Sequence, residues 1–135
     1  MATWAACGNF DGQEKLVRQF WRSGWAGVVT SGWGYLRCGP TTSTWGYRHI
    51  RDSHQQDWYN IAFGLGSDWR SFADWCIEQV LANPDYVVYR DANATFTYRT
   101  IVYIHNSQGE VISTYRPIVS IGLGNERIIT AYPAH

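Results

Sequence analysis

Residues 95–119 read T-F-T-Y-R-T-I-V-Y-I-H-N-S-Q-G-E-V-I-S-T-Y-R-P-I-V, which are mostly β-branched and aromatic residues around one polar turn. Such residues favour strands, so we expect strands over 95–105 and 110–119. The intervening N-S-Q-G at 106–109 predicts a hairpin between them. Pro117 has no amide hydrogen to donate, so its strand is expected to lie at a sheet edge or to be bulged there.

Two further strand-like segments flank this hairpin, Y-V-V-Y-R at 86–90 and E-R-I-I-T-A-Y at 126–132. Both are rich in β-branched and aromatic residues. The second half of the chain therefore predicts four antiparallel strands.

The first half of the chain has a different pattern. Apolar residues at i, i+4 spacing predict helices over residues 12–25 and 47–65. A third helix is expected to begin at Ser67, a good N-cap, and to end before Pro84. Residues 26–44 are rich in Gly, Ser and Thr and are expected to be mostly loop. The order predicts an α+β fold with N-terminal helices packed on one face of a curved four-stranded antiparallel sheet.

The composition suits one compact domain spanning residues 1–135. Apolar content of 45% and aromatic content of 16% exclude a disordered chain. No apolar run reaches the length that spans a bilayer, and the N-terminus lacks the basic start and apolar core of a secretory signal. We therefore expect a soluble domain with no membrane partner.

The formal net charge is zero, so bulk charge predicts no affinity for nucleic acid. Lys15 is the one lysine, and the other cationic residues are arginines. From Tyr86 onward four arginines stand against three acidic residues, so a modest basic face is possible there.

The cysteines are three, with no C-x-x-C spacing. Cys7 and Cys38 each precede a glycine in loop-like sequence, and the pair could form a disulfide or remain two thiols. Cys76 falls on the apolar stripe of the third predicted helix and is expected to be a buried free thiol.

Residues 45–58, W-G-Y-R-H-I-R-D-S-H-Q-Q-D-W, contain the densest group of candidate catalytic residues. His49 and His54 lie here with Arg48 and Arg51. Imidazole exchanges protons near neutral pH, and guanidinium is a permanent cation suited to phosphate. The segment therefore points to chemistry on a phosphodiester.

The two imidazoles are not expected on one helix face. Five residues correspond to a rotation of about 140° on a helix, and His54 shares the apolar stripe. The rings would converge if His49 preceded a helix that begins near Asp52 or Ser53. The alternative is a core histidine at 54, hydrogen-bonded to the backbone, and a surface histidine at 49.

The last predicted strand places Thr130 and Tyr132 on one face, because side chains alternate along a strand. Their hydroxyls could hold a phosphate, or they could be ordinary sheet residues. Arg99 and Arg116 would stabilise a phosphate transition state if they lie on the concave face of the sheet, and would be merely solvated on the other face.

Other chemistries are weakly supported by the motifs. The spacing of His49 and His54 is not the i, i+4 pair of a zinc protease helix, and no G-x-S-x-G is present. A nucleophilic pair of Cys38 and His49 stays open. We expect neither a metal nor another cofactor.

Two stretches carry a resemblance to a known family: Cys38–Trp58, with R-H-I-x-x-x-H, and Arg127–Pro133, ending in T-A-Y-P. With the order of helices and strands, they resemble the toxin domains with the barnase–EndoU–colicin–RelE fold. These domains lie at the C-termini of bacterial polymorphic toxins.

The resemblance implies a metal-independent ribonuclease, often acting on tRNA. Such a toxin is secreted, acts in the cytoplasm of a competing cell, and is neutralised at home by a cognate immunity protein. By motif position, the resemblance assigns catalysis to His49, His54, Thr130 and Tyr132. Arg116 as a catalytic residue and Arg48 as a substrate-binding residue match more loosely. From their residue type and position alone, Arg51 and Arg99 are further candidates for substrate binding.

Two other function classes fit the sequence. Eight tryptophans and nine tyrosines could line the groove of a secreted binding module. A delivered toxin domain could instead catalyse ADP-ribosyl transfer or deamidation, which would leave RNA intact.

Overall fold

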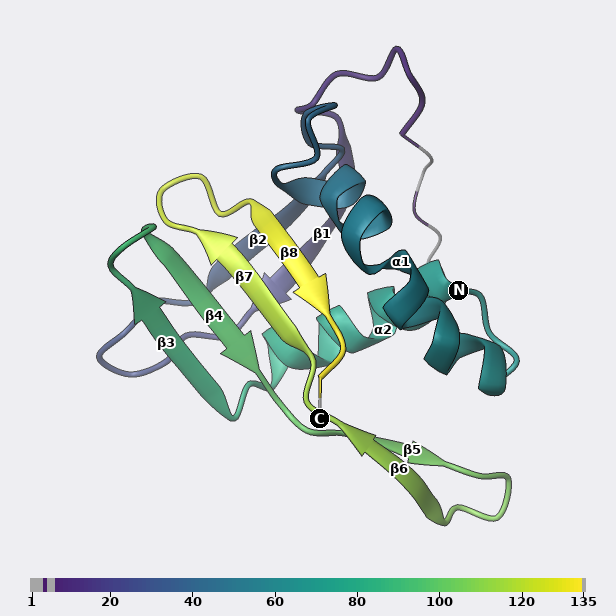
Figure 1. The fold of residues 1–135 in the computed structure, drawn as a ribbon. Helices are drawn as coiled ribbons and strands as arrows, with labels where there is room; N and C mark the ends of the chain where they lie inside the picture. The colour runs from purple at the N-terminus through teal and green to yellow at the C-terminus, as the bar shows by residue number, and fades with distance from the viewer. Residues whose placement is uncertain (1–3, 5–6, 135) are drawn as a thin grey trace.

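The computed structural model describes Trp4 and residues 7–134, shown as a ribbon in Figure 1. The elements follow in chain order: β1 (Leu16–Arg22), β2 (Gly32–Arg37), α1 (Gly46–Gly64), α2 (Trp69–Ala82), β3 (Tyr86–Arg90), β4 (Thr95–Arg99), β5 (Val102–His105), β6 (Val111–Tyr115), β7 (Ile118–Gly122) and β8 (Ile128–Tyr132).

The central sheet has the strand order β3-β4-β7-β8, and all three neighbouring pairs are antiparallel. The expected α+β class and the four-stranded antiparallel sheet are therefore confirmed. A bridge between Tyr35 and Arg127 places β2 beside β8, so the β1–β2 hairpin adjoins this sheet. The β5–β6 hairpin projects away from it (Figure 1).

Two of the predicted strands are each divided in the structure. Residues 95–105 form β4 and β5, and residues 110–119 contribute to β6 and β7. The second division falls at Arg116–Pro117, where the missing amide hydrogen of proline interrupts the ladder. The predicted turn is present, because the Gly109 amide donates to the Asn106 carbonyl at 3.0 Å.

The predicted helix over residues 12–25 is wrong, because this segment contains β1. β1 pairs with β2, which lies inside the expected loop at 26–44. A four-residue spacing of apolar side chains fits two strand repeats as well as one helical turn. Phe20 is buried while Trp21 is exposed, which is the alternation of a strand.

Both remaining predicted helices are present. α1 spans Gly46–Gly64, close to the expected 47–65. α2 begins one residue later than expected, because Asp68 is its N-cap and accepts from the Ser71 amide at 2.8 Å. In the described part of the chain, no helix is long and apolar enough to cross a bilayer.

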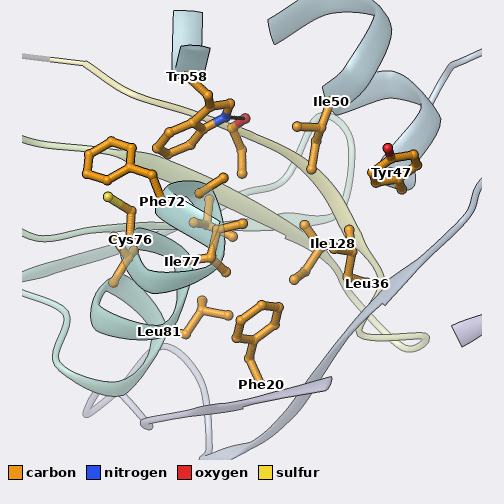
Figure 2. Packing of buried hydrophobic residues seen from close by; sticks show 14 of the residues in the cluster. Phe20, Leu36, Tyr47, Ile50, Trp58, Phe72, Cys76, Ile77, Leu81 and Ile128 are labelled. Carbon is orange, nitrogen blue, oxygen red and sulfur yellow. Dashed lines mark hydrogen bonds between the residues drawn. The ribbon is translucent and has the colours of Figure 1, made fainter. Parts of the chain in front are cut away.

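The core lies between the helices, the β1–β2 hairpin and one face of the central sheet (Figure 2). The side chains of Trp58, Ile77 and Ile128 are fully buried there. Trp58 also donates its indole N–H to the Ala131 carbonyl at 3.1 Å, which ties α1 to β8. The opposite face of the sheet, which carries the alternate residues, is left open to the outside.

The loop that precedes β1, residues 7–15, is the N-terminal loop, and a disulfide between Cys7 and Cys38 anchors it. Arg48 adds three hydrogen bonds from its guanidinium, to the carbonyls of Gly8, Asp11 and Gly39. Together these contacts join the loop to the end of β2 and to the first turn of α1. Cys76 is the free thiol, buried in the core as expected.

Candidate active site

The contact between α1 and β8 brings together four of the predicted catalytic residues. Nε2 of His49 lies 3.0 Å from Oγ1 of Thr130. The ring of His54 stacks on Tyr132, with centroids 4.8 Å apart and planes 23° from parallel. The two histidine rings meet edge to face, with centroids 5.4 Å apart.

The spacing along the two elements explains this pairing. Five residues of a helix rise by about 7.5 Å. Two residues of a strand advance by about 6.8 Å, so positions 49 and 54 on the helix match positions 130 and 132 on the strand. α1 lies along β8 in Figure 1, which lets each histidine contact one of the two strand residues.

The rings meet although the condition set for their convergence, a helix that begins near Asp52 or Ser53, is not fulfilled: α1 begins at Gly46 and contains both histidines. They meet because each flanks the helix face that packs on β8, at whose centre Ile50 is fully buried. The interpretation of His54 as a core residue is wrong, since its side chain is 21% exposed.

Hydrogen bonding sets the tautomer of His49. Nδ1 lies 3.0 Å from the Ser43 carbonyl oxygen, which can only accept, so Nδ1 carries the hydrogen. In the neutral ring Nε2 then holds the lone pair and accepts from the Thr130 hydroxyl. Nε2 of His49 is therefore oriented as a base toward β8.

His54 has a carboxylate partner. Nδ1 of His54 lies 3.2 Å from Oδ2 of Asp57, one turn further along α1. An ionised carboxylate only accepts, so Nδ1 is the donor and Nε2 is left for proton exchange. The stacked ring of Tyr132 holds the imidazole in this orientation.

Two glycines allow the chain to bring His49 into place. Gly46, the first residue of α1, has φ +84°, and a Cβ there would lie 2.7 Å from the Arg37 carbonyl oxygen. Gly39 has φ +79°, and a Cβ there would overlap the Trp45 carbonyl oxygen. Only glycine fits so close a crossing of two backbones at positive φ.

A cleft of about 640 Å³ lies on the open face of the central sheet. Thr130 and Tyr132 form its β8 end, next to the two histidines. Ile129 of β8 also lines the cleft, and the remaining lining residues come from β3, β4, β7 and the segments beside them: Tyr86, Arg90, Asn93, Thr95, Thr97, Arg99, Arg116, Ile118 and Ser120. This lining contains three arginines and no carboxylate.

Hydroxyl groups form a row across the middle of the cleft. Thr97, Ser120 and Thr130 are register partners on β4, β7 and β8. Oγ1 of Thr97 lies 3.4 Å from Oγ of Ser120, and Arg90 donates to the same Thr97 oxygen at 3.3 Å. The row leads from the arginine on β3 to the Thr130–His49 pair.

Arg99 and Arg116 each keep one buried donor without a partner among the described residues. Nε of each is buried, and neither has a hydrogen-bond partner within the described part of the chain. Arg116 is also held by Asp85 at 2.5 Å, and Arg99 donates to the Arg116 carbonyl at 3.2 Å. Both residues line the cleft, so their guanidiniums provide positive charge for an anion there.

Two predicted substrate-binding residues lie outside the cleft. Arg48 is only 4% exposed, and its guanidinium donates hydrogen bonds to the carbonyls of Gly8 and Gly39. Arg51 is bound to Asp52 at 2.8 Å on the outer side of α1. That hydrogen bond, followed by one from the Ser43 hydroxyl, lowers the pKa of Asp52 below its ordinary value.

The sequence reasoning missed several residues around this site. Asp57 was signalled by its i, i+3 spacing from His54 in a predicted helix. Thr97 and Ser120 were signalled by strand alternation, since they share a face with Arg99 and Ile118. The Ser43 carbonyl had no signal, because every residue carries a backbone carbonyl.

The alternative nucleophile pair of Cys38 and His49 is wrong, because Cys38 is buried in the disulfide with Cys7. Among the residues that the structure describes, no group of three or more His, Cys, Asp or Glu side chains is placed to hold a metal ion.

Comparison with known proteins finds two similar curated proteins, both of Mycobacterium tuberculosis. They are described as uncharacterized protein MT0764 (strain CDC 1551 / Oshkosh) and uncharacterized protein Rv0739 (strain ATCC 25618 / H37Rv). Each is 34% identical to this chain over 140 residues, covering 96% of this chain and 49% of the relative. The chain thus spans about half the length of these relatives. No protein-family model and no solved structure matches it significantly.

Proposed function

We propose that this domain is a metal-independent endoribonuclease that cleaves RNA by attack of a 2′-hydroxyl on the adjacent phosphate. The observation that carries the proposal is the pairing of His49 with Thr130 and of His54 with Tyr132 beside a cleft containing three arginines. RNA supplies its own nucleophile, so the protein needs only a base, an acid and groups that stabilise the charged phosphate.

His49 is the base in this mechanism. Its Nδ1 hydrogen is held by the Ser43 carbonyl, so the lone pair on Nε2 accepts the proton of the 2′-hydroxyl. The substrate hydroxyl replaces the Thr130 hydroxyl at Nε2, and Thr130 then donates to the phosphate. The 2′ oxygen bonds to phosphorus as its proton leaves.

His54 is the acid. Its Nδ1 remains bonded to Asp57, and protonated Nε2 gives its hydrogen to the departing 5′ oxygen. The bond between phosphorus and that oxygen breaks, which leaves a 2′,3′-cyclic phosphate and a 5′-hydroxyl. The two histidines are in ring contact, so base and acid act on the same phosphate.

Side chains at the sheet bind the phosphate as it reacts. Arg116 and Arg99 supply guanidinium cations, and Tyr132 supplies a hydroxyl. Fixed donors aimed at developing charge typically contribute about 10²–10³-fold each to the rate.

The biological role follows the family resemblance. The domain is a C-terminal toxin domain of a polymorphic toxin, with the curved sheet of the barnase–EndoU–colicin–RelE fold. Helices that precede a four-stranded antiparallel sheet support this layout. It is delivered into competing cells, cuts RNA such as tRNA in their cytoplasm, and is neutralised by an immunity protein in the producing cell.

The test is incubation of the purified domain with total RNA, with and without EDTA, followed by mapping of the ends. We expect undiminished cleavage in EDTA that leaves 2′,3′-cyclic phosphates. Chelator-sensitive cleavage would contradict the mechanism. Intact RNA together with modified protein would point to ADP-ribosyl transfer or deamidation instead.

A further inference from the structure

The cleft has a tyrosine at each end, and the proposed chemistry uses only one of the two, Tyr132. Tyr86, Arg99, Ile118 and Tyr132 are register partners on β3, β4, β7 and β8, so they form one row across the sheet. All four line the cleft. Neighbouring strands lie about 4.8 Å apart, so the row spans about 14 Å from Tyr86 to Tyr132.

The two tyrosines differ in what surrounds them. Tyr132 stacks on His54 and belongs to the proposed catalytic end. Tyr86 is 46% exposed and lies on the edge strand β3. An exposed ring facing a cleft offers a flat, rigid surface that a planar ligand can cover.

Cationic donors lie between the two rings. Arg99 belongs to the row. Arg116, which lies between β6 and β7, lines the same cleft. Their buried Nε groups have no partner among the described residues. The order across the row is therefore the Tyr86 ring, Arg99, Ile118 and the Tyr132 ring, and Arg116 lines the same cleft beside the row.

We propose that this row binds a single-stranded RNA segment, with one base stacked on Tyr86 and the connecting phosphate held by Arg99 and Arg116. The assignment rests on the proposed ribonuclease function, since it places the scissile phosphate at the Tyr132 end. Aromatic rings alternating with cations are how proteins bind unpaired nucleotides, because only an unpaired base exposes its face. The preferred substrate is accordingly unpaired RNA that extends at least one nucleotide beyond the cleaved bond, toward β3.

The same strand provides a matched control. Tyr89 is also on β3 and 37% exposed, but it points to the opposite face of the sheet, where it contacts Phe96. Tyr86→Ala removes the proposed stacking surface, Tyr86→Phe retains it, and Tyr89→Ala removes an equivalent ring elsewhere.

Binding is measured with a fluorescent single-stranded 2′-deoxy oligonucleotide of about 8 nucleotides, which lacks the nucleophile and cannot be cut. A stacked base contributes about 1–3 kcal/mol, so Tyr86→Ala should weaken binding by roughly 5- to 150-fold. Tyr86→Phe and Tyr89→Ala should bind the oligonucleotide with nearly the affinity of the unmodified protein. A duplex of the same sequence should bind more weakly than the single strand.

Equal effects of Tyr86→Ala and Tyr89→Ala, or a duplex bound as tightly as the single strand, would overturn the inference. RNA cleavage that persists beside such a result would leave the proposed function intact. Conversely, binding that depends on Tyr86 in a protein that cuts no RNA would keep the single-strand site and refute the proposed chemistry.

Discussion

Nε2 of His49 accepts from the hydroxyl of Thr130 at 3.0 Å, although 81 positions separate the two residues in the chain. The contact joins the first turns of α1 to the middle of the last strand. It exists because Gly39 and Gly46 let the chain cross closely before α1, and because α1 lies along β8. The proposed chemistry depends on this pair and on its neighbour, His54 with Tyr132.

Replacement of either histidine by alanine should abolish most of the ribonuclease activity. A general acid or base contributes about 10²–10⁴-fold, so His49→Ala and His54→Ala should each lose at least about 10²-fold in kcat/KM. His105→Ala is the control, because His105 is exposed on β5 and lies outside the cleft. Full activity in a folded His54→Ala protein would refute the assignment.

Thr130→Val removes the hydroxyl at nearly constant volume. The lost donor to the phosphate should lower kcat by about 10²-fold or more, with a smaller change in KM, because the interaction is strongest in the transition state. Thr114→Val, on the exposed surface of β6, is the matched substitution and should leave both constants unchanged. A rise in KM alone would instead assign Thr130 to substrate binding.

Gly46→Ala should destabilise the fold. The added Cβ would lie 2.7 Å from the Arg37 carbonyl oxygen, and φ +84° is unfavourable for alanine. We expect the free energy of unfolding to fall by at least about 1–3 kcal/mol in chemical denaturation. Gly64→Ala, the last residue of α1, has open space around its Cβ and should be neutral or slightly stabilising.

The disulfide and the buried thiol predict how many cysteines react with a thiol reagent before and after unfolding. Burial raises the pKa of Cys76 to about 12, so the native protein should not react with a thiol reagent at pH 8. Unfolding without reductant should expose one thiol, since Cys7 and Cys38 are bonded. Three reactive thiols after unfolding would contradict the disulfide.

The same pKa has a consequence for stability at high pH. A raised pKa in the folded state means that the folded protein holds the thiol proton more tightly than the unfolded chain. The associated stability is fully present below the ordinary value of 9.0 and is lost as pH rises toward 12. Cys76→Ala should reduce this loss in denaturation curves measured across that range.

The strands of the second half were predictable because they carry a local signal. β-branched and aromatic residues marked all the segments that form the central sheet, and the polar turn at 106–109 marked the hairpin. The divisions within two of those segments had no such signal apart from Pro117. Continuous strand-like composition says nothing about which partner each half of a segment pairs with.

The first predicted helix failed for a related reason. Leu16 and Phe20 are four residues apart, which suits both a helix and a strand. Pairing of β1 with β2 resolved the choice, and Trp21 then met Trp33 across the hairpin, with ring centroids 5.3 Å apart. Such a pairing depends on a second segment that a local window does not contain.

By itself, the sequence determined the α+β class, the four-stranded antiparallel sheet, both long helices and the residue types available for catalysis. These follow from periodicity and composition, which act between near neighbours. The tertiary structure determined which residues meet. It brought His49 and His54 to Thr130 and Tyr132, gathered Arg90, Arg99 and Arg116 in one cleft, and buried Arg48 beneath the N-terminal loop. Those outcomes depend on the packing of α1 against β8 and on strand register, and both are set by contacts between segments far apart in the chain.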